Sequence, residues 1–288
     1  MWDDVTQVVN VASVPQRSPF RYPGGKTWLV PRTRQWLATL PIKPLRFIEP
    51  FAGGAIVGLT VAFEELARSV ILVERDEQVA AVWTTILNTR DGAEWLADRI
   101  ATFDLTPTSV NTLLSSRARS AKERAFQTIV QNRISHGGIL APGAGVLKHG
   151  ENGKGIRSRW YPETLKRRIL AIGRLRDRMR FVKGDGFAVI RQYIEQPNAI
   201  FFIDPPYTAS TKRAGTRLYK YHQVDHEELF HLAARIKGDF LMTYDDAEEV
   251  RSLAVKYRLE YRSIAMNNTH HATLSELLIG RHMSWIRF

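Results

Sequence analysis

The sequence contains no cysteine among its 288 residues. The chain therefore forms no disulfide bond, binds no zinc through thiolates and has no thiol nucleophile. Long hydrophobic runs are missing too, since no stretch approaches the roughly 20 apolar residues that a membrane-spanning helix needs. The first residues, Met1-Trp2-Asp3-Asp4, lack the basic and apolar regions of a secretory signal. These absences are compatible with a reducing, intracellular setting, and we expect no membrane partner.

Negative charge is scarce in one part of the sequence. The chain has 41 Lys and Arg against 29 Asp and Glu, a net charge of +12 and a pI near 10.1. Arg117 to Arg180 contains 16 basic and 4 acidic residues, and the rest of the chain is balanced. We interpret this concentration as a surface for a polyanion, of which nucleic acid is the commonest. The alternative is a solvated surface that keeps the protein soluble.

The most informative motif follows the apolar run Ala199 to Ile203. The run shows no apolar–polar alternation, which predicts a strand covered on both faces, as in a parallel sheet. The next residues are Asp204-Pro205-Pro206-Tyr207, and the two prolines end the strand because they lack an N–H. Open α/β sheets bind ligands where their strands end. An acid, free carbonyls and an aromatic ring suit a planar group that bears an amine; the alternative is a simple proline-rich turn.

Strands and helices alternate in the first part of the sequence. Apolar runs predict strands at 45–49, 69–74, 180–183, 199–203, 240–243, 257–265 and 277–279, and helical periodicity predicts helices at 27–40, 55–67, 77–88 and 162–179. The β-α-β order predicts an α/β fold with a mostly parallel sheet. We expect a catalytic domain (18–90 and 180–288), a basic and mainly helical insert (91–179) and a flexible tail (1–17).

A second candidate site is the turn Glu49-Pro50-Phe51-Ala52-Gly53-Gly54 after the first predicted strand. Glycines let a ligand approach the backbone, and the following helix offers free N–H groups. The dinucleotide spacing G-x-G-x-x-G is absent and Glu49 would repel an anion, so a nucleoside or a cationic ligand fits better than a diphosphate. Glu74, at the end of the next strand, suits ribose hydroxyls, and we expect Asp185 to flank the same cleft.

The segment Arg21-Tyr22-Pro23-Gly24-Gly25-Lys26-Thr27 ends like a P-loop. A P-loop has a glycine five residues before its Gly-Lys pair, but that position is Phe20, and no strand precedes it. We therefore interpret Lys26 as a point charge beside a cleft and Tyr22 as a stacking surface.

Together these motifs resemble the Dam-like family of DNA adenine methyltransferases. Arg21 to Lys26, Glu49 to Gly54 and Asp204 to Tyr207 match three family motifs in the family's order. Asn132 to Ile139 and Ser275 to Leu278 are similar to further segments of the family. The chain departs from the family in two places. Alanine stands at position 52, where members often have glycine, and glutamate stands at position 74, where the ribose-binding acid is usually aspartate.

The resemblance implies a Rossmann-like methyltransferase core with an inserted DNA-recognition domain. It implies S-adenosylmethionine as methyl donor, no metal, and the exocyclic amine of adenine in double-stranded DNA as acceptor, reached by base flipping. The expected catalytic residues are Asp204, Pro205, Pro206 and Tyr207. The expected cofactor-binding residues are Tyr22, Lys26, Glu49, Phe51, Ala52, Gly53, Gly54, Glu74, Asp185 and Asp204. The expected DNA contacts are Asn132, Arg133, Lys148, Lys154, Arg157 and Arg159.

The resemblance also bears on biology. It implies a bacterial or phage-encoded enzyme of the cytoplasm, associated with the nucleoid, and we expect a monomer. Family members occur with or without a cognate restriction enzyme, so such a partner is compatible with the sequence.

The residue chemistry agrees with this expectation. Hydrogen bonds from an adenine amine to the Asp204 carboxylate and the Pro205 carbonyl favour a pyramidal nitrogen that attacks a methyl group. Flipping a base costs a few kcal/mol, and stacking on Tyr207 returns about 1–3 kcal/mol. Two alternatives stay open at this point. One is methylation of another amine, in cytosine, RNA adenine or protein glutamine, although those enzymes more often carry Ser or Asn in place of Asp204. The other is a DNA-binding protein with an inactive methyltransferase fold.

Overall fold

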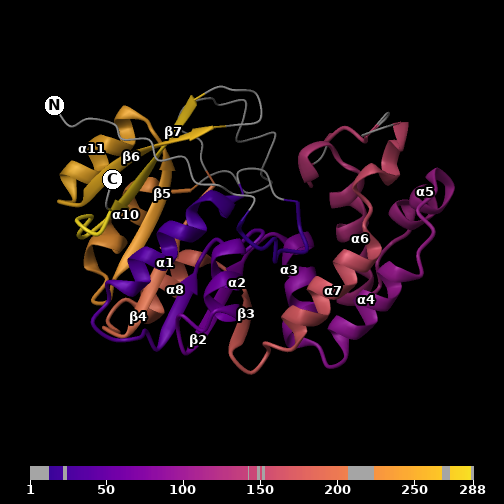
Figure 1. The fold of residues 1–288 in the computed structure, drawn as a ribbon, viewed down its shortest axis with the longest axis horizontal. Helices are drawn as coiled ribbons and strands as arrows, with labels where there is room; N and C mark the ends of the chain where they lie inside the picture. Colours follow the sequence, from indigo (N-terminus) through magenta and orange to yellow (C-terminus); the bar gives the residue numbers. More distant parts are fainter. Residues whose placement is uncertain are drawn as a thin grey trace.

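The computed structural model describes residues 13–21, 25–141, 143–147, 150, 153–206, 224–267 and 273–286. Seven strands form one sheet in the order β3-β2-β1-β4-β5-β7-β6 (Figure 1). The strands are β1 (Arg46–Glu49), β2 (Ser69–Glu74), β3 (Met179–Lys183), β4 (Ala199–Ile203), β5 (Phe240–Asp245), β6 (Glu260–Asn267) and β7 (Thr273–Gly280). Strands β1 to β5 pair in parallel, and β7 is antiparallel to both β5 and β6. The mostly parallel α/β sheet confirms the predicted fold class.

Helices pack on the sheet and extend beyond one edge of it. The α-helices are α1 (Val30–Ala38), α2 (Ile56–Phe63), α3 (Glu77–Trp83), α4 (Gly92–Ala101), α5 (Pro107–Ser115), α6 (Ala121–Ile134), α7 (Pro162–Gly173), α8 (Gly186–Tyr193), α10 (His226–Arg235) and α11 (Glu248–Lys256). Shorter helical turns are η2 (Lys26–Leu29), η3 (Thr84–Asn88), η4 (His136–Gly138) and η6 (Gly155–Arg159). Within the described part of the chain, no helix has the length and apolar character to cross a bilayer.

The sheet is buried on both faces. In β4, Ile200 and Phe202 join a hydrophobic cluster that includes residues of α1 and α2. Phe201 and Ile203, on the opposite face, join a cluster that includes residues of α8 and α10. All four side chains are at most 3% exposed, which explains why this strand reads as one continuous apolar run.

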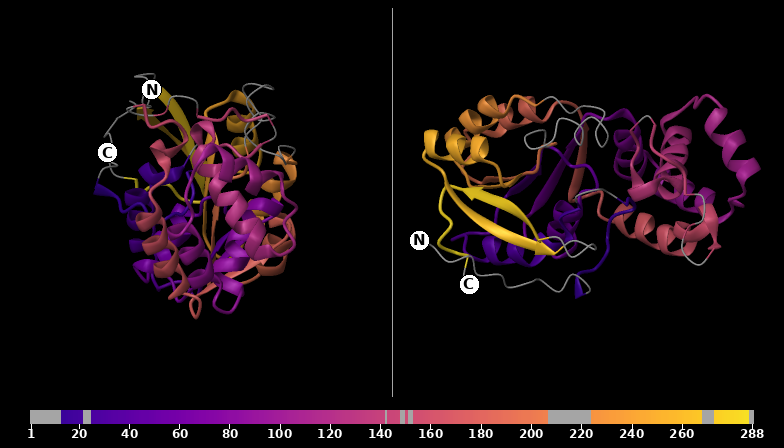
Figure 2. Two further views of the ribbon diagram at one scale, coloured as in Figure 1. Left: turned by 90° about the vertical axis from the view of Figure 1, so that its right-hand side faces the viewer. Right: turned by 90° about the horizontal axis from the view of Figure 1, so that it is seen from above.

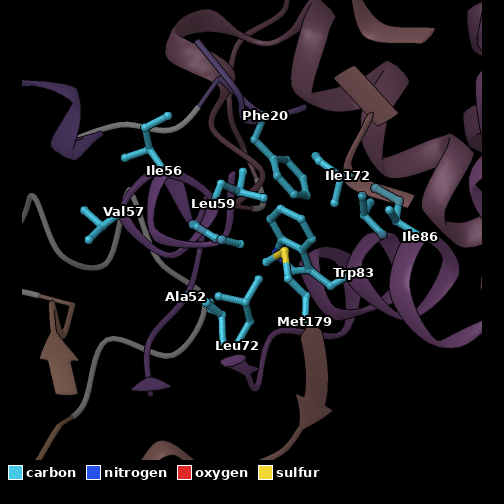
Figure 3. Packing of buried hydrophobic residues seen from close by; sticks show 14 of the residues in the cluster. Phe20, Ala52, Ile56, Val57, Leu59, Leu72, Trp83, Ile86, Ile172 and Met179 are labelled. Carbon is cyan, nitrogen blue, oxygen red and sulfur yellow. The ribbon is translucent and has the colours of Figure 1, made fainter. Parts of the chain in front are cut away.

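Helices α4 to α7 gather at one end of the molecule, beyond β3 and away from β5, β6 and β7 (Figures 1 and 2). Their apolar faces share a core with the sheet. Trp83 lies close to Phe20, with ring centroids 5.8 Å apart, and the same cluster includes Ile172 of α7 and Met179 of β3 (Figure 3). Because this core is continuous, the helical region and the sheet support each other. Target recognition by residues 91–179 stays a prediction.

Several element boundaries differ from the sequence-based expectation. Helix α7 ends at Gly173 instead of continuing to Met179, because Met179 pairs with Val70 at the start of β3. A Cβ atom at Gly173 would lie 2.6 Å from that of Ala93, so this glycine permits close packing of α7 on α4. Arg258, with a φ of 56°, separates α11 from β6 and places the start of β6 three residues later than expected.

The expected flexible tail is packed where the structure describes it. Val14 is buried in the hydrophobic core. Arg17 lies 2.8 Å from a carboxylate oxygen of Glu64 and stacks over Phe63 of α2. Residues 1–12 of the expected tail lie outside the described residues. The N-terminal segment from Ser13 is therefore part of the folded domain.

Candidate active site

A cavity of about 560 Å³ opens where the parallel strands end. Its lining includes four acids that follow or end neighbouring strands: Glu49 of β1, Glu74 of β2, Asp185 after β3 and Asp204 after β4. The volume lies within the range of roughly 300–1,000 Å³ found for small-molecule sites. Parallel α/β sheets bind ligands at this edge, so the structure brings the two main sequence motifs into one candidate site.

Asp204 is held by two groups from distant parts of the chain. The Thr243 hydroxyl of β5 donates a hydrogen bond to Asp204 Oδ1 over 2.7 Å. The Lys26 ammonium of η2 lies 3.3 Å from the same oxygen. Pro205 and Pro206 follow Asp204 and also line the cavity. The carboxylate is therefore oriented before any ligand arrives.

Lys26 is surrounded by carboxylates. Its side chain is buried, and Nζ donates a hydrogen bond of 3.1 Å to Glu276 Oε1 of β7. Glu276 is 5% exposed, and burial raises its pKa to about 7, aided by Asp204 and Asp245 and opposed by Lys26. Burial also raises the pKa of Asp245, which lies opposite Glu276 in the β5–β7 ladder. The expected point charge beside the cleft thus makes ion pairs with the catalytic candidate and with Glu276.

Glu49 is buried against the helix that follows the glycine turn. Its Oε2 accepts a hydrogen bond of 2.8 Å from the Gly58 amide of α2. A Cβ atom at position 58 would collide with the same oxygen, so glycine is required there for this arrangement. Burial raises the pKa of Glu49 well above its usual range, although the hydrogen bond from Gly58 opposes the shift. This wall of the cavity is acidic and poorly solvated.

Glu74 joins the end of β2 to the glycine turn. Its Oε2 accepts from the Gly53 amide over 2.9 Å, and its Oε1 accepts from the amides of Arg75 and Asp76 over 2.7 and 2.8 Å. Burial raises the pKa of Glu74, and these three backbone bonds oppose the shift. The extra methylene relative to aspartate lets the carboxylate reach back to the turn. A contact with ribose stays a prediction.

The alanine at position 52 fits the turn without strain. Positive φ values fall on Gly53 and Ala55, at 46° and 51°, and not on Ala52. The Ala52 amide donates to the Val73 carbonyl over 2.9 Å, and its methyl group packs among core residues near Leu72 (Figure 3). Ala52 is therefore part of the core and, at the same time, of the cavity lining. Ala55, in contrast, adopts a left-handed conformation that glycine would adopt at lower cost.

Two aromatic rings and an acid line another wall of the cavity. Asp185 accepts a hydrogen bond from the Phe187 amide over 3.1 Å and so begins α8. Phe51 and Phe187 meet edge to face with centroids 6.0 Å apart. A Cβ atom at Gly186 would lie 2.5 Å from the Pro50 carbonyl oxygen, so this glycine lets α8 approach the turn. Aromatic rings beside a carboxylate suit a flat ligand with polar edges.

Asn132 and Arg133 are buried rather than exposed. Asn132 accepts from the Arg21 amide over 2.9 Å and donates to the carbonyls of Arg21 and Gly138 over 2.8 and 2.6 Å. Arg133 is 5% exposed, donates to the Pro19 carbonyl and lines the cavity. Asn132 thus links the N-terminal segment to α6 and is unavailable to DNA in this arrangement, which corrects its expected role.

Arg133 belongs to a group of arginines on one side of the cavity. Arg21 and Arg168 line the same side, and Arg168 donates to the Ser18 carbonyl over 3.1 Å. Burial, with Arg168 and Arg21 nearby, lowers the pKa of Arg133 to about 9. Within the described residues, Arg133 Nε and Arg21 Nη1 are buried without a hydrogen-bond partner. Unused donors on clustered cations favour an anionic ligand there.

The other expected DNA contacts lie elsewhere. Lys154 and Arg157 of the η6 region are exposed, and Arg159 is partly exposed. Arg157 makes a 2.9 Å ion pair with Asp104. The expected residues Tyr22, Lys148 and Tyr207 lie outside the described residues. Contacts of Lys154, Arg157 and Arg159 with phosphate stay predictions.

Sequence reasoning missed Thr243, which donates to Asp204, and Asp245, whose pKa Asp204 raises. Thr243 and Asp245 end an apolar strand with polar side chains, the same signal that identified Glu74, and that signal was available. Glu276 matched a family segment, but its pairing with Lys26, 250 positions away, has no local signal.

Residues 153–267 match the sequence model of a family described as D12 class N6 adenine-specific DNA methyltransferase. The matched segment contains Asp204, Thr243 and Asp245. It supports the resemblance read from the motifs. A comparison with curated proteins gave no match.

Solved methyltransferase structures show only a loose likeness. The rRNA methyltransferase aviRa from Streptomyces viridochromogenes is 15% identical with a TM-score of 0.40, covering 90% of this chain and 86% of that chain. A precorrin-6y C5,15-methyltransferase from Geobacter metallireducens is 10% identical with a TM-score of 0.35, covering 88% and 87%. TYW2 from P. horikoshii in complex with MeSAdo is 10% identical with a TM-score of 0.33, covering 87% and 61%. Scores this low support no functional argument, so the fold assignment rests on the order of the strands.

Proposed function

We propose that this chain, a member of the Dam-like family of DNA adenine methyltransferases, transfers a methyl group from S-adenosylmethionine to the exocyclic amine of adenine in double-stranded DNA. The motifs and the match over residues 153–267 support this family. One observation supports the proposal most: Asp204 and Pro205 open into the same cavity as the glycine turn of Glu49 to Gly54. A methyl donor and a methyl acceptor need such adjacent positions.

The cavity fits a nucleoside that bears a positive charge. When bound, S-adenosylmethionine supplies an electrophilic methyl group on a sulfonium. Carboxyl groups at the ends of β1, β2 and β3 are hydrogen-bond partners for hydroxyl and amino groups, and a bound cation would favour their ionised forms. Phe51 and Phe187 offer apolar contact to an adenine ring. Gly53 lets the ligand approach the backbone closely.

Asp204 and Pro205 act on the methyl acceptor. The Asp204 carboxylate and the Pro205 carbonyl accept the two hydrogens of the adenine amine, which directs its nitrogen lone pair away from conjugation with the ring. As the nitrogen gains positive charge, the carboxylate stabilises it, and this preorganised electrostatic contribution accelerates transfer. Thr243 and Lys26 hold Asp204 at Oδ1. The reaction needs no covalent intermediate on the protein, in keeping with a chain that has no cysteine.

The positive side of the cavity supports a nucleic-acid substrate. Arg21, Arg133 and Arg168 offer charge-assisted donors to a phosphate beside the extruded nucleotide. Lys154, Arg157 and Arg159 extend positive charge toward the exposed surface. Flipping the base costs a few kcal/mol, and Tyr207 is the proposed stacking partner of the extruded ring.

Methyl incorporation into defined substrates tests the proposal. The purified protein is incubated with S-adenosylmethionine labelled in its methyl group and with duplex DNA, the same sequence as RNA, or a glutamine-containing protein. Nucleosides and peptides are then identified by mass spectrometry. The expected product is N6-methyladenine in duplex DNA. Methylcytosine, methylated RNA or methylated glutamine would contradict the proposed acceptor, and tight DNA binding without incorporation would indicate an inactive fold.

The remaining parts of the proposal concern the working state. We propose a monomer that needs no metal, so chelation by EDTA should leave incorporation unchanged, and sedimentation should give a mass near 32.9 kDa. Modification-sensitive sequencing of DNA from cells that express the protein identifies the recognition sequence. An extract of the same cells is also incubated with unmodified DNA. Cleavage at the recognition sequence would reveal a cognate restriction enzyme.

A further inference from the structure

Lys26 lies between two carboxylates, Asp204 and Glu276, that both come from the second half of the chain. Its Nζ is 3.3 Å from Asp204 Oδ1, and 3.1 and 3.0 Å from the two oxygens of Glu276. Lys26 and Glu276 are 4% and 5% exposed. One buried cation is thus shared by the proposed acceptor of the amine hydrogens and by a glutamate that the mechanism above does not use.

The two oxygens of Glu276 have different surroundings. Oε1 accepts a hydrogen bond from Lys26, whereas Oε2 lies within ion-pair distance of Nζ but is buried without a hydrogen bond. Oε1 is occupied by its hydrogen bond from Lys26, which leaves Oε2 as the oxygen that can take up a proton when the ion pair with Lys26 is given up. The charged groups that face Glu276 are Lys26 from η2, Asp204 from the end of β4 and Asp245 from β5.

We propose that Glu276 is a positioning residue that controls how much of the Lys26 charge is available to Asp204. When Glu276 is ionised, Lys26 pairs more closely with Glu276, at 3.0 and 3.1 Å, than with Asp204, at 3.3 Å. The negative charge of Asp204 is then less neutralised, and Asp204 is a strong hydrogen-bond acceptor for the amine. When Glu276 takes up a proton at Oε2, its ion pair with Lys26 is lost, the charge of Lys26 acts more strongly on Asp204, and Asp204 becomes a weaker acceptor. The inference rests on the proposed function, because it needs Asp204 to act on the substrate amine.

The direction of the pH dependence follows from this arrangement. Burial and the neighbouring carboxylates raise the pKa of Glu276 to about 7. Raising the pH through this value removes the proton, strengthens Asp204 and increases the rate of methyl transfer. A hydrogen bond to a charged acceptor is worth about 1 kcal/mol more than one to an uncharged acceptor. We therefore expect the rate of methyl transfer to rise about fivefold between low and high pH.

The test compares the wild-type protein with Glu276→Gln and with a control, Asp245→Asn. Glutamine has the same size and still accepts from Lys26, but it has no titrating charge. The rate of a single methyl transfer to saturating duplex DNA is measured from about pH 5.5 to pH 8.5, a range that extends on both sides of the pKa of Glu276. The wild-type rate should rise with a midpoint near pH 7. The Glu276→Gln rate should stay at the low level throughout, whereas Asp245→Asn should keep the rise.

Three results would overturn the inference. They are an unchanged pH profile in Glu276→Gln, a rise that disappears in Asp245→Asn instead, and a parallel loss of affinity for S-adenosylmethionine and DNA that accounts for the rate. Because Glu276→Gln could unfold the chain, Glu276→Asp is measured too; it keeps the charge and should keep a pH-dependent rate. A wild-type protein that transfers no methyl group overturns the proposed function as well, so the two failures are distinguishable.

Discussion

Replacing Asp204 by asparagine tests the central chemical claim. Asparagine has the same shape and can still accept from Thr243, whose hydroxyl lies 2.7 Å from Oδ1. The substitution removes the negative charge that faces the substrate amine. Lys26 keeps its ion pair with Glu276 in this variant, so the buried cation still has a partner of opposite charge. The variant should therefore fold, and its defect should appear in the reaction.

The expected magnitude follows from the kind of interaction that is lost. Removing one preorganised group that stabilises transition-state charge typically costs about 2.7–4 kcal/mol. Each ~1.36 kcal/mol of barrier is a tenfold change in rate, so Asp204→Asn should slow methyl transfer about 100- to 1,000-fold. Removing a single supporting hydrogen bond, in Thr243→Val, should cost only about 1 kcal/mol, or roughly fivefold.

The assay separates binding from reaction. Single-turnover incorporation of labelled methyl groups gives the rate, and fluorescence anisotropy and calorimetry give the dissociation constants for DNA and S-adenosylmethionine. Asp204→Asn should retain its DNA affinity within a small factor. If it instead keeps a tenth or more of the wild-type rate, or if Thr243→Val is the slower of the two, Asp204 does not play the role described.

Three further predictions address the cofactor wall, the DNA surface and the shared core. Gly58→Ala forces a methyl group against Glu49, so calorimetry should show affinity for S-adenosylmethionine reduced roughly 5- to 150-fold, as expected for overpacking of about 1–3 kcal/mol; an unchanged affinity would remove Glu49 from the site. Neutralising Arg157 and Arg159 should weaken DNA binding and reduce its salt-dependence slope by about 0.9 per lost phosphate contact; an unchanged slope would exclude both from the interface. Ile129→Ala, at a fully buried position of α6, should cost about 2–5 kcal/mol in chemical denaturation with one transition; two separate transitions would mean that the helical region has its own core.

Local patterns predicted the central elements because their causes are local. The strands 69–74 and 199–203 were predicted with the bounds that the structure shows, since unbroken apolar runs end there at acids. The placement of Asp204 follows in the same way, because two prolines must leave the ladder directly after it. The fold class followed from the order of these elements.

Boundaries set by contacts between elements were predicted less well. Helix α7 ends at Gly173 because Met179, six residues later, already pairs with Val70 of β2. Helix α4 also packs closely against α7 at Gly173. The family resemblance placed Asn132 at the DNA, yet Asn132 is fully buried, since the N-terminal segment packs over α6 and bonds to it; Arg133 is buried too, but it lines the cavity. Composition does not indicate which face of a helix another segment will cover.

The amino-acid pattern was enough to specify a buried strand, a rigid acid at its end, a glycine turn and a basic middle region, because periodicity and the missing N–H of proline act within a few residues. The environment of that acid depended on the assembled sheet. Strand β7 is inserted antiparallel beside β5, which brings Glu276 next to Asp245 and within hydrogen-bond distance of Lys26. Such an arrangement arises from strand order and register, and the energies that set them come from the burial of residues far apart along the chain.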